Sequence, residues 1–297
     1  MEMILECKNL YKKLGKKQIL KDVSFDIYEG DIMAFIGPNG AGKTTTIKLI
    51  LGLQSIDKGS VIINGYNVKT DFVKAIEKVG CIVENPDVYM YLSGYDNLKL
   101  IANTYKNITK EKIDELVKLV GLENRIKDKV SKYSLGMRQR LGIAAALINE
   151  PNLLILDEPT NGLDPEGIKD LRNLLKKLAK EKNMGILISS HNLAELESFC
   201  SKVCVISDGE IIDYNDIKNF KHVDNVYRIT VDDTSKIELK DMKNVKKTSF
   251  EINASKEQIS KIIKELVKQD IDIYEVVELE LSLEEAFLQK AGGNKIV

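Results

Sequence analysis

The sequence predicts an α/β fold, with helices packed against a mostly parallel sheet, on three observations. Apolar or alternating runs of strand length recur along the chain, segments with helical periodicity separate them, and short turns join the earliest runs. Alternating strands and helices are typical of a parallel sheet, whereas the short turns predict an antiparallel sheet joined to it. The expected strands are residues 3–7, 23–27, 31–36, 61–63, 79–83, 153–156, 185–189 and 203–212.

Helical patterns fill the intervals between these runs. In residues 166–182, the apolar side chains form one stripe that we expect to pack on the sheet. Residues from about 86 to 140 are mainly helical in pattern, which predicts a helical subdomain inserted in the core. The stripe consists of Ile168, Leu171, Leu174, Leu175 and Leu178.

The pattern changes after residue 217, so we expect a domain of residues 1–217 and a small α+β accessory domain of residues 218–297. No motif assigns chemistry to the second domain. Its charges are typical of a solvated face, and a regulatory or dimer-stabilising role is the alternative. The expected elements are strands at 226–231, 249–254 and 271–279, a helix at 255–269, and capping boxes at Ser255 with Gln258 and Ser282 with Glu285.

Charge and hydropathy restrict the partners. The 297 residues include 44 Lys and Arg against 45 Asp and Glu, so no basic field predicts a nucleic-acid partner. No run of about 18 apolar residues could span a bilayer. We expect a cytoplasmic protein that would reach the inner face of the membrane only through a partner.

The cysteines of the chain lack the spacing of a metal site and are expected to be buried, reduced thiols: Cys7, Cys81, Cys200 and Cys204.

The most specific motif is the glycine-rich stretch GPNGAGKTT. It lies between an apolar strand and a helical pattern, the context in which GxxxxGK[ST] binds phosphates. Its N–H groups would face an anion at a helix N-terminus, while Lys43 reaches the β- and γ-phosphates. Thr44 would bind Mg²⁺ and Thr45 would contact the α-phosphate of ATP. A turn without function is the alternative. The expected binding residues are Gly37, Pro38, Asn39, Gly40, Ala41, Gly42, Lys43, Thr44 and Thr45.

A second motif, NLLILDEPT, ends an apolar strand with two carboxylates. Alone, this pattern is common in proteins and indicates little. Beside a phosphate loop it predicts different roles for the two residues: Asp157 holds Mg²⁺, and Glu158 acts on the attacking water as a general base or positioning group.

Residues 134–138, Ser-Leu-Gly-Met-Arg, precede this motif and resemble the LSGGQ signature of the ABC transporter ATPases. The resemblance covers residues 3 to about 217. It implies a head-to-tail homodimer, in which Ser134 and the Gly136 amide cap the γ-phosphate bound by the other copy. The alternative is that these residues only cap a helix.

Two further residues take their expected roles from this resemblance. NGLDPEG resembles the D-loop of the family, in which Asp164 would couple the two sites of the dimer. His191, in ILISSHNLAELE, lies where the family has a switch histidine that contacts the γ-phosphate, although a lone histidine is more often a surface residue.

The residue at the end of the strand KVGCIV departs from the family pattern. The family commonly has Gln there, beside Mg²⁺, whereas this chain has Glu84, a stronger oxygen ligand for the ion. With the ENP that begins at Glu84 and the sequence SLGMRQRLGIA, this resembles exporters for bacitracin resistance and lantibiotic self-protection. The resemblance implies that residues 85–91 and the helices after them meet a separately encoded membrane permease, or else that their aromatics only pack the subdomain.

The adenine contact is the second departure. The family usually has an aromatic residue just before Gly15, where this chain has Leu14. Either Tyr11 stacks on the base instead, or the base is held loosely.

Together these motifs predict an ATPase that energises a membrane subunit for export of, or resistance to, an antimicrobial peptide. Two alternatives remain. One is a non-transport ABC ATPase acting on nucleic acid or the ribosome. The other is a weakly hydrolysing, nucleotide-gated regulatory protein.

Overall fold

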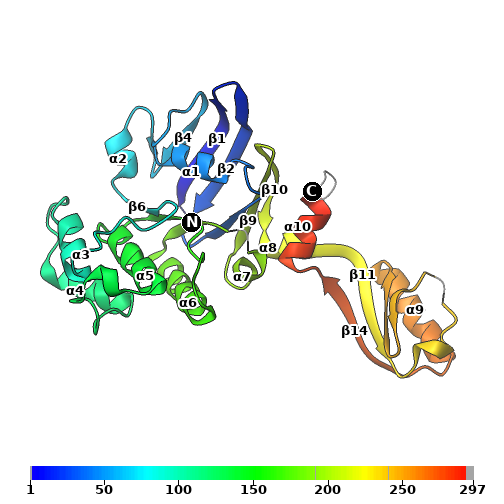
Figure 1. The fold of residues 1–297 in the computed structure, drawn as a ribbon. Helices are drawn as coiled ribbons and strands as arrows, with labels where there is room; N and C mark the ends of the chain where they lie inside the picture. Colours follow the sequence, from blue (N-terminus) through cyan, green and yellow to red (C-terminus); the bar gives the residue numbers. More distant parts are fainter. Residues whose placement is uncertain (1, 191, 240, 292–297) are drawn as a thin grey trace. The chain divides into compact units, whose positions relative to one another are not determined.

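A computed structural model describes residues 2–190, 192–239 and 241–291 (Figure 1). The described chain forms two compact units. One contains the residues up to Ile217 together with Lys290 and Ala291, and the other contains Lys218–Gln289.

The first unit is built on a six-stranded sheet in the order β10-β9-β3-β8-β7-β6. Its strands are parallel except β10, which runs antiparallel to β9. Every residue of β3, β7 and β8 is buried, as in a sheet covered on both faces. The strands are β3 (Ile32–Ile36), β6 (Val79–Ile82), β7 (Leu153–Asp157), β8 (Gly185–Ser189), β9 (Lys202–Ser207) and β10 (Glu210–Asp216).

The single strand expected at 203–212 is wrong, because β9 and β10 form a hairpin. Asp208 and Gly209 between them have φ of 49° and 83°. Two successive residues with positive φ reverse the chain in a tight turn, and Asp-Gly is itself a hairpin signal that the apolar residues on both sides concealed.

An antiparallel sheet in the order β2-β1-β4-β5 accompanies the central sheet, as expected. Its first two strands are longer than predicted, 12 residues each. Asn9 and Asp22 have φ of 47° and 59°, and the register shifts near them break the alternation that marks a strand. The strands are β1 (Met3–Leu14), β2 (Lys17–Tyr28), β4 (Lys58–Ile63) and β5 (Tyr66–Asn67), the last of which was not predicted.

Helices of the first unit follow the predicted periodicity. In α6, Asp164 caps the N-terminus, Pro165 follows it, and Leu171, Leu175 and Leu178 are buried on one face. The helix α5 continues to Ala146, beyond the expected limit of the helical region. The helices are α1 (Lys43–Ile50), α2 (Phe72–Ile76), α3 (Gly94–Ala102), α4 (Lys110–Leu119), α5 (Leu135–Ala146), α6 (Pro165–Lys182) and α7 (Leu193–Glu197), with a 3₁₀ turn, η1 (Val130–Lys132).

One core joins the two sheets of the first unit. It includes Leu5, Phe35, Ile47 and Ile206, all fully buried, from β1, β3, α1 and β9. The core therefore fixes β3 and α1, the elements on either side of the glycine-rich loop.

The second unit has a sheet in the order β12-β13-β11-β14, whose core includes Ile229, Phe250 and Leu266. Both predicted capping boxes are confirmed by reciprocal bonds, with Ser255 N donating to Gln258 and Ser282 N donating to Glu285, each over 2.8 Å. The elements are α8 (Ile217–Lys221), β11 (His222–Val231), η2 (Thr234–Lys236), β12 (Lys243–Lys246), β13 (Ser249–Asn253), α9 (Lys256–Lys268), β14 (Ile273–Glu280) and α10 (Leu283–Ala291).

Within the described residues, the helices are all too short or too polar to cross a bilayer. The cysteines are free thiols, as predicted, but Cys81 is exposed rather than buried. It lies on β6, an edge strand of the central sheet, where one neighbouring strand is absent.

Candidate functional site

The glycine-rich loop connects β3 to α1, and its shape depends on glycine. A Cβ on Gly37 would lie 2.1 Å from the carbonyl oxygen of Ile206. Gly40 and Gly42 have φ of 78° and 113°, which other residues rarely adopt. A glycine-rich loop that leads into the N-terminus of a helix, here α1, presents backbone N–H groups that stabilise an anion.

Lys43 folds back over this loop. Its Nζ donates to the carbonyl oxygens of Gly37 and Pro38, over 2.6 Å and 3.3 Å. Burial lowers the pKa of the Lys43 ammonium, and the carboxylates of Glu158 and Asp157 partly oppose this effect. The lysine is therefore a buried cation near two carboxylates, and a phosphate would satisfy it better than the carbonyls.

Asp157 is buried at the end of β7, and each of its two carboxylate oxygens accepts a hydrogen bond from a hydroxyl group. Thr44 Oγ1 donates to Oδ2 over 3.1 Å, and Ser189 Oγ donates to Oδ1 over 2.5 Å. The structure thus brings together Thr44 and Asp157, which the sequence assigned to one metal ion.

Ser189, at the end of β8, was not predicted as a site residue. Besides its bond to Asp157, its hydroxyl accepts a hydrogen bond from the Glu158 N–H over 2.9 Å. It is fully buried and so positions both carboxylate residues at once. The signal in the sequence was a polar residue ending an apolar strand, ILISS, beside the predicted His191.

Glu158 has the left-handed φ of 53°, an uncommon conformation for a residue that is not glycine. Asn161, also missed from the sequence, donates from Nδ2 to Glu158 Oε2 over 3.1 Å. Uncommon backbone conformations of this kind cluster at functional sites. His191, the predicted switch histidine, lies outside the described residues.

Glu84 is exposed and also has a positive φ, of 65°. Its Oε1 accepts from Lys48 Nζ over 3.1 Å. Lys48 follows Thr44 by four residues, so both lie on one face of α1, about one turn apart. The carboxylate is therefore bound to the phosphate-loop helix, one turn from the Thr44 hydroxyl.

The signature and D-loop residues lie at the N-termini of α5 and α6. Ser134 is exposed and caps α5, accepting from Met137 N over 3.3 Å, and Asp164 caps α6, accepting from Gly167 N over 2.9 Å. Gly136 has room for a Cβ, whose nearest neighbour would be 3.7 Å away. Across the described residues, no hydrogen bond or ion pair joins these three residues to the glycine-rich loop.

Tyr11 lies on β1 opposite Lys58 of β4, and the Lys58 ammonium is 4.9 Å from the centre of its ring. Leu14, at the end of the same strand, is exposed. One side of the Tyr11 ring thus contacts a cation.

A glycine-rich loop with a buried lysine after β3, together with Asp and Glu at the end of β7 in the same sheet, defines a nucleoside triphosphatase of the phosphate-loop class. Comparison with known proteins names the family. The sequence model of the protein family described as ABC transporter matches residues 20–161 of this chain. The chain belongs to the ABC transporter family, as one of its ATP-binding, ATP-hydrolysing subunits.

The similarity extends over the whole chain. An uncharacterised ABC transporter ATP-binding protein of Bacillus subtilis (strain 168), YhcH, is 46% identical over 99% of this chain and 98% of its own length. The bacitracin transport ATP-binding protein BcrA of Bacillus licheniformis is 37% identical over the full length of both chains. The lantibiotic transport ATP-binding protein SrtF of Streptococcus pyogenes is 44% identical over 75% of this chain and 96% of its own. The predicted resemblance to these transport proteins is confirmed.

Solved structures support the fold. A dimeric, post-hydrolysis ATP-binding cassette, MJ0796, bound to ADP and phosphate, superposes with a TM-score of 0.65 at 26% identity, over 72% of this chain and 99% of that chain.

Proposed function

We propose that this chain is the energising subunit of an exporter for antimicrobial peptides, and that two copies hydrolyse ATP at sites they share. The observation that carries the proposal is the separation of the two halves of the site. The loop, Asp157 and Glu158 are linked by hydrogen bonds, directly or through Ser189, whereas Ser134 caps its own helix and has no described hydrogen bond to any of them.

The residues around Asp157 fit a magnesium ion. Mg²⁺ prefers one or two hard oxygen ligands from the protein and completes its shell with water and phosphate oxygens. Asp157 Oδ2 and the Thr44 hydroxyl, 3.1 Å apart, supply this set. In the described chain no three acidic, histidine or cysteine side chains could hold a metal alone, so the phosphates of ATP would contribute. When bound, Mg²⁺ neutralises charge on the phosphate oxygens.

Glu158 is the residue we assign to the attacking water. Its carboxylate accepts a hydrogen bond from Asn161, and its N–H donates to Ser189, so both ends of the residue are positioned. A carboxylate held in this way orients a water molecule and takes its proton as the water oxygen bonds to the γ-phosphorus and the bond from that phosphorus to the β–γ bridging oxygen breaks, which releases ADP and phosphate. Lys43 remains on the phosphates throughout as a fixed cation.

The second copy would complete each site. Ser134 and Gly136 lie at the N-terminus of α5, a helix of 12 residues, where the hydroxyl and the free N–H groups can bind an anion. Asp164 lies at the start of α6, exposed for contact across the dimer.

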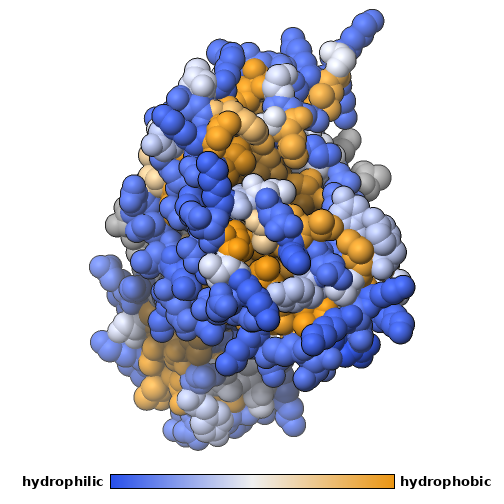
Figure 2. Space-filling model, turned by 90° about the vertical axis from the view of Figure 1, so that its left-hand side faces the viewer, coloured by the Kyte–Doolittle hydropathy of each residue, from blue (hydrophilic) through white to orange (hydrophobic). Residues whose placement is uncertain are grey.

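The membrane permease would dock on the surface that includes residues 85–91. Tyr89, Met90 and Tyr91 are 54%, 38% and 67% exposed. Figure 2 shows apolar side chains gathered on the face it views, among polar residues. A cavity of about 370 Å³ beside this loop is lined by Pro86, Val88 and Tyr105, among others. Exposed apolar surface of this kind marks protein contacts.

The decisive experiment is the Glu158→Gln variant. It should bind ATP with unchanged affinity, stop hydrolysing it, and shift from monomer to dimer when ATP and Mg²⁺ are added, as measured by light scattering. Normal turnover would refute the role of Glu158, and a monomer with bound ATP would refute the shared site.

The peptide substrate rests on the names of the relatives and needs a separate test. Coexpression with its membrane subunit should raise the concentration of bacitracin or a lantibiotic that a sensitive host survives, and Glu158→Gln should abolish the gain. Resistance that persists in the variant would show that transport is not its cause.

A further inference from the structure

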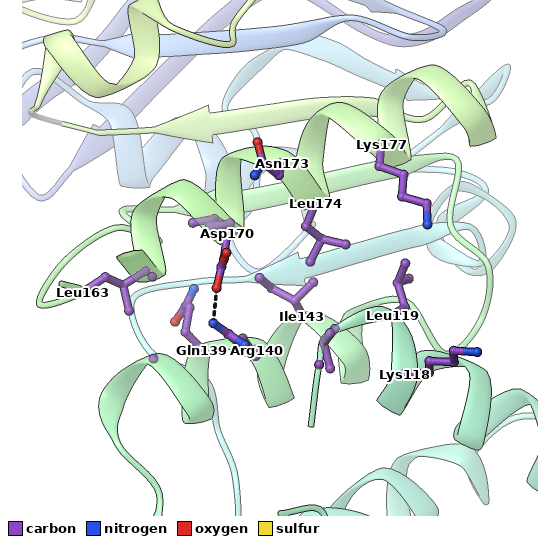
Figure 3. Close-up of a pocket in the computed structure, with 15 residues that line it drawn as sticks. Lys118, Leu119, Gln139, Arg140, Ile143, Leu163, Asp170, Asn173, Leu174 and Lys177 are labelled. Carbon is purple, nitrogen blue, oxygen red and sulfur yellow. Dashed lines mark hydrogen bonds and ion pairs between the residues drawn. The ribbon is translucent and has the colours of Figure 1, made fainter. Parts of the chain in front are cut away.

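A cavity of about 350 Å³ lies between the end of α4, the helix α5 and the helix α6, away from the phosphate loop (Figure 3). Its lining includes Gly136, at the N-terminus of α5, and otherwise consists of residues to which the functions proposed above assign no role. Two of the three helices that form its walls, α5 and α6, begin at signature or D-loop residues, so a ligand in the cavity can affect those residues. Its principal lining residues are Leu119, Gln139, Arg140, Ile143, Asp170 and Leu174.

One end of the cavity contains an unsatisfied polar group. Gln139 is 7% exposed, and its Nε2 has no hydrogen-bond partner. Beside it, Arg140 and Asp170 form an ion pair that neutralises both charges (Figure 3). An unpaired buried donor is costly, so an oxygen atom entering this end would gain a hydrogen bond that the chain does not supply.

The other end is basic. Lys118 from α4 and Lys177 from α6 line it, and both are exposed. Neither has an ion-pair partner in the described part of the chain. Figure 3 shows both lysines at the end remote from Gln139. Lys177 follows Asp170 by seven residues on α6, which is a rise of about 10 Å along the helix axis.

The walls between these ends are apolar. Ile143 of α5, Leu119 of α4 and Leu174 of α6 lie between the polar groups (Figure 3). Water could satisfy Gln139 but would leave this apolar surface hydrated, at a cost proportional to its area. The lining therefore favours a ligand with an apolar body and two polar ends.

We propose that this cavity binds a small, elongated amphipathic anion. Its carboxylate lies between Lys118 and Lys177, its apolar body contacts Ile143 and Leu174, and an oxygen acceptor at its far end receives the hydrogen bond of Gln139. Three basic side chains against one acidic one on the lining oppose a cationic ligand.

Such a ligand would regulate ATP hydrolysis, a consequence that rests on the proposed function. It contacts α5 and α6, which begin at the residues that would close on the second copy, Ser134 and Asp164. A ligand that bridges the two helices fixes their spacing and so changes the rate at which the shared site closes.

Binding is tested on the nucleotide-free chain by titration calorimetry, which requires no hydrolysis. The probe is 10-hydroxydecanoate, with decanoate lacking the distal oxygen and decane-1,10-diol lacking the charge. We expect 10-hydroxydecanoate to bind most tightly of the three. Absence of binding at millimolar concentration, or a diol that binds equally well, would overturn the anion site.

Matched charge reversals locate the site. The double variant Lys118→Glu with Lys177→Glu should weaken binding of 10-hydroxydecanoate by up to about 25-fold, since each of the two contacts is worth up to about fivefold. Lys110→Glu with Lys180→Glu changes the same charge on the same two helices outside the cavity and should bind as the natural chain does. Equal loss in both variants would show only a long-range charge effect and would refute the site.

Two further measurements separate the parts of the proposal. Gln139→Met should abolish the preference for 10-hydroxydecanoate over decanoate, and a preference that persists would refute the contact with Gln139. ATP turnover is then measured with and without saturating 10-hydroxydecanoate. Unchanged turnover with bound probe would refute regulation, whereas a chain without any turnover would refute the proposed function and leave the binding result unaffected.

Discussion

Removal of the Ser189 hydroxyl is the sharpest test of the nucleotide site. In Ser189→Ala, Asp157 Oδ1 loses its 2.5 Å hydrogen bond in a fully buried position. A hydrogen bond to a charged group contributes about 1.5–3 kcal/mol to the free energy of unfolding. The Glu158 N–H loses the same hydroxyl but retains the Ser189 carbonyl at 3.2 Å, so it adds little to the loss.

These magnitudes convert into two measurable shifts. In a unit of this size about 1.5–3 kcal/mol lowers the melting temperature by roughly 3–12 °C. If the loss of about 1.5–3 kcal/mol raises the activation free energy of ATP hydrolysis by the same amount, turnover falls by about 10–150-fold. ATP affinity should change little, because Ser189 makes no hydrogen bond to the phosphate loop among the described contacts.

The neighbouring serine is the matched control. Ser190 is equally buried, but its hydroxyl accepts from Asn192 N over 3.0 Å and has no described bond to either carboxylate. Ser190→Ala should therefore retain most of the turnover. Equal loss of turnover in the two variants, or full activity in Ser189→Ala, would refute the positioning role.

Three other predictions follow from single contacts. Glu84→Gln should raise the Mg²⁺ concentration needed for half-maximal ATPase activity. Lys48→Met removes the ion pair that holds Glu84 and should lower this concentration by up to about fivefold. A lower concentration for Glu84→Gln together with a higher one for Lys48→Met would refute Glu84 as a ligand. Gly42→Ala should destabilise the chain by about 1–3 kcal/mol in thermal unfolding and weaken ATP binding, because φ is 113° and a Cβ would approach a leucine side chain to 2.5 Å. Arg228 lowers the pKa of Glu251, so their ion pair stabilises the fold above the unfolded pKa of the carboxyl and is lost as the pH falls through the folded value. Arg228→Met should thus cost about 0.5–1 kcal/mol at pH 7 and less near pH 3, and an equal cost at both pH values would contradict this pairing.

The elements that position the site were predictable because they are local patterns. The strand before Gly37, the helix after Lys43 and the strand ending at Asp157 all follow from apolar runs and glycine spacing. Turns inside apolar runs were harder to predict, as the hairpin at Asp208 shows, because the apolar pattern continues on both sides of the turn.

Contacts between segments that are distant along the chain could not be predicted from the sequence. Ser189 and Asp157 are 32 residues apart and meet because β7 and β8 are neighbours, an adjacency that no local pattern encodes. The same holds for the cavity beside Gln139, whose walls come from three helices. Motifs predict which residues perform chemistry, whereas the residues that hold them in position require the strand order.

The ion pair of Glu84 and Lys48 illustrates what strand order adds to a motif. Glu84 begins the ENP that leads into residues 85–91, the proposed contact with the membrane permease, while Lys48 lies one turn after Thr44 on the helix that would bind the phosphates. One exposed pair therefore joins the docking loop to the nucleotide site. Because such a pair is worth at most about 1 kcal/mol, a magnesium ion that attracts the carboxylate would break it, and nucleotide binding would then release the loop that is proposed to contact the permease.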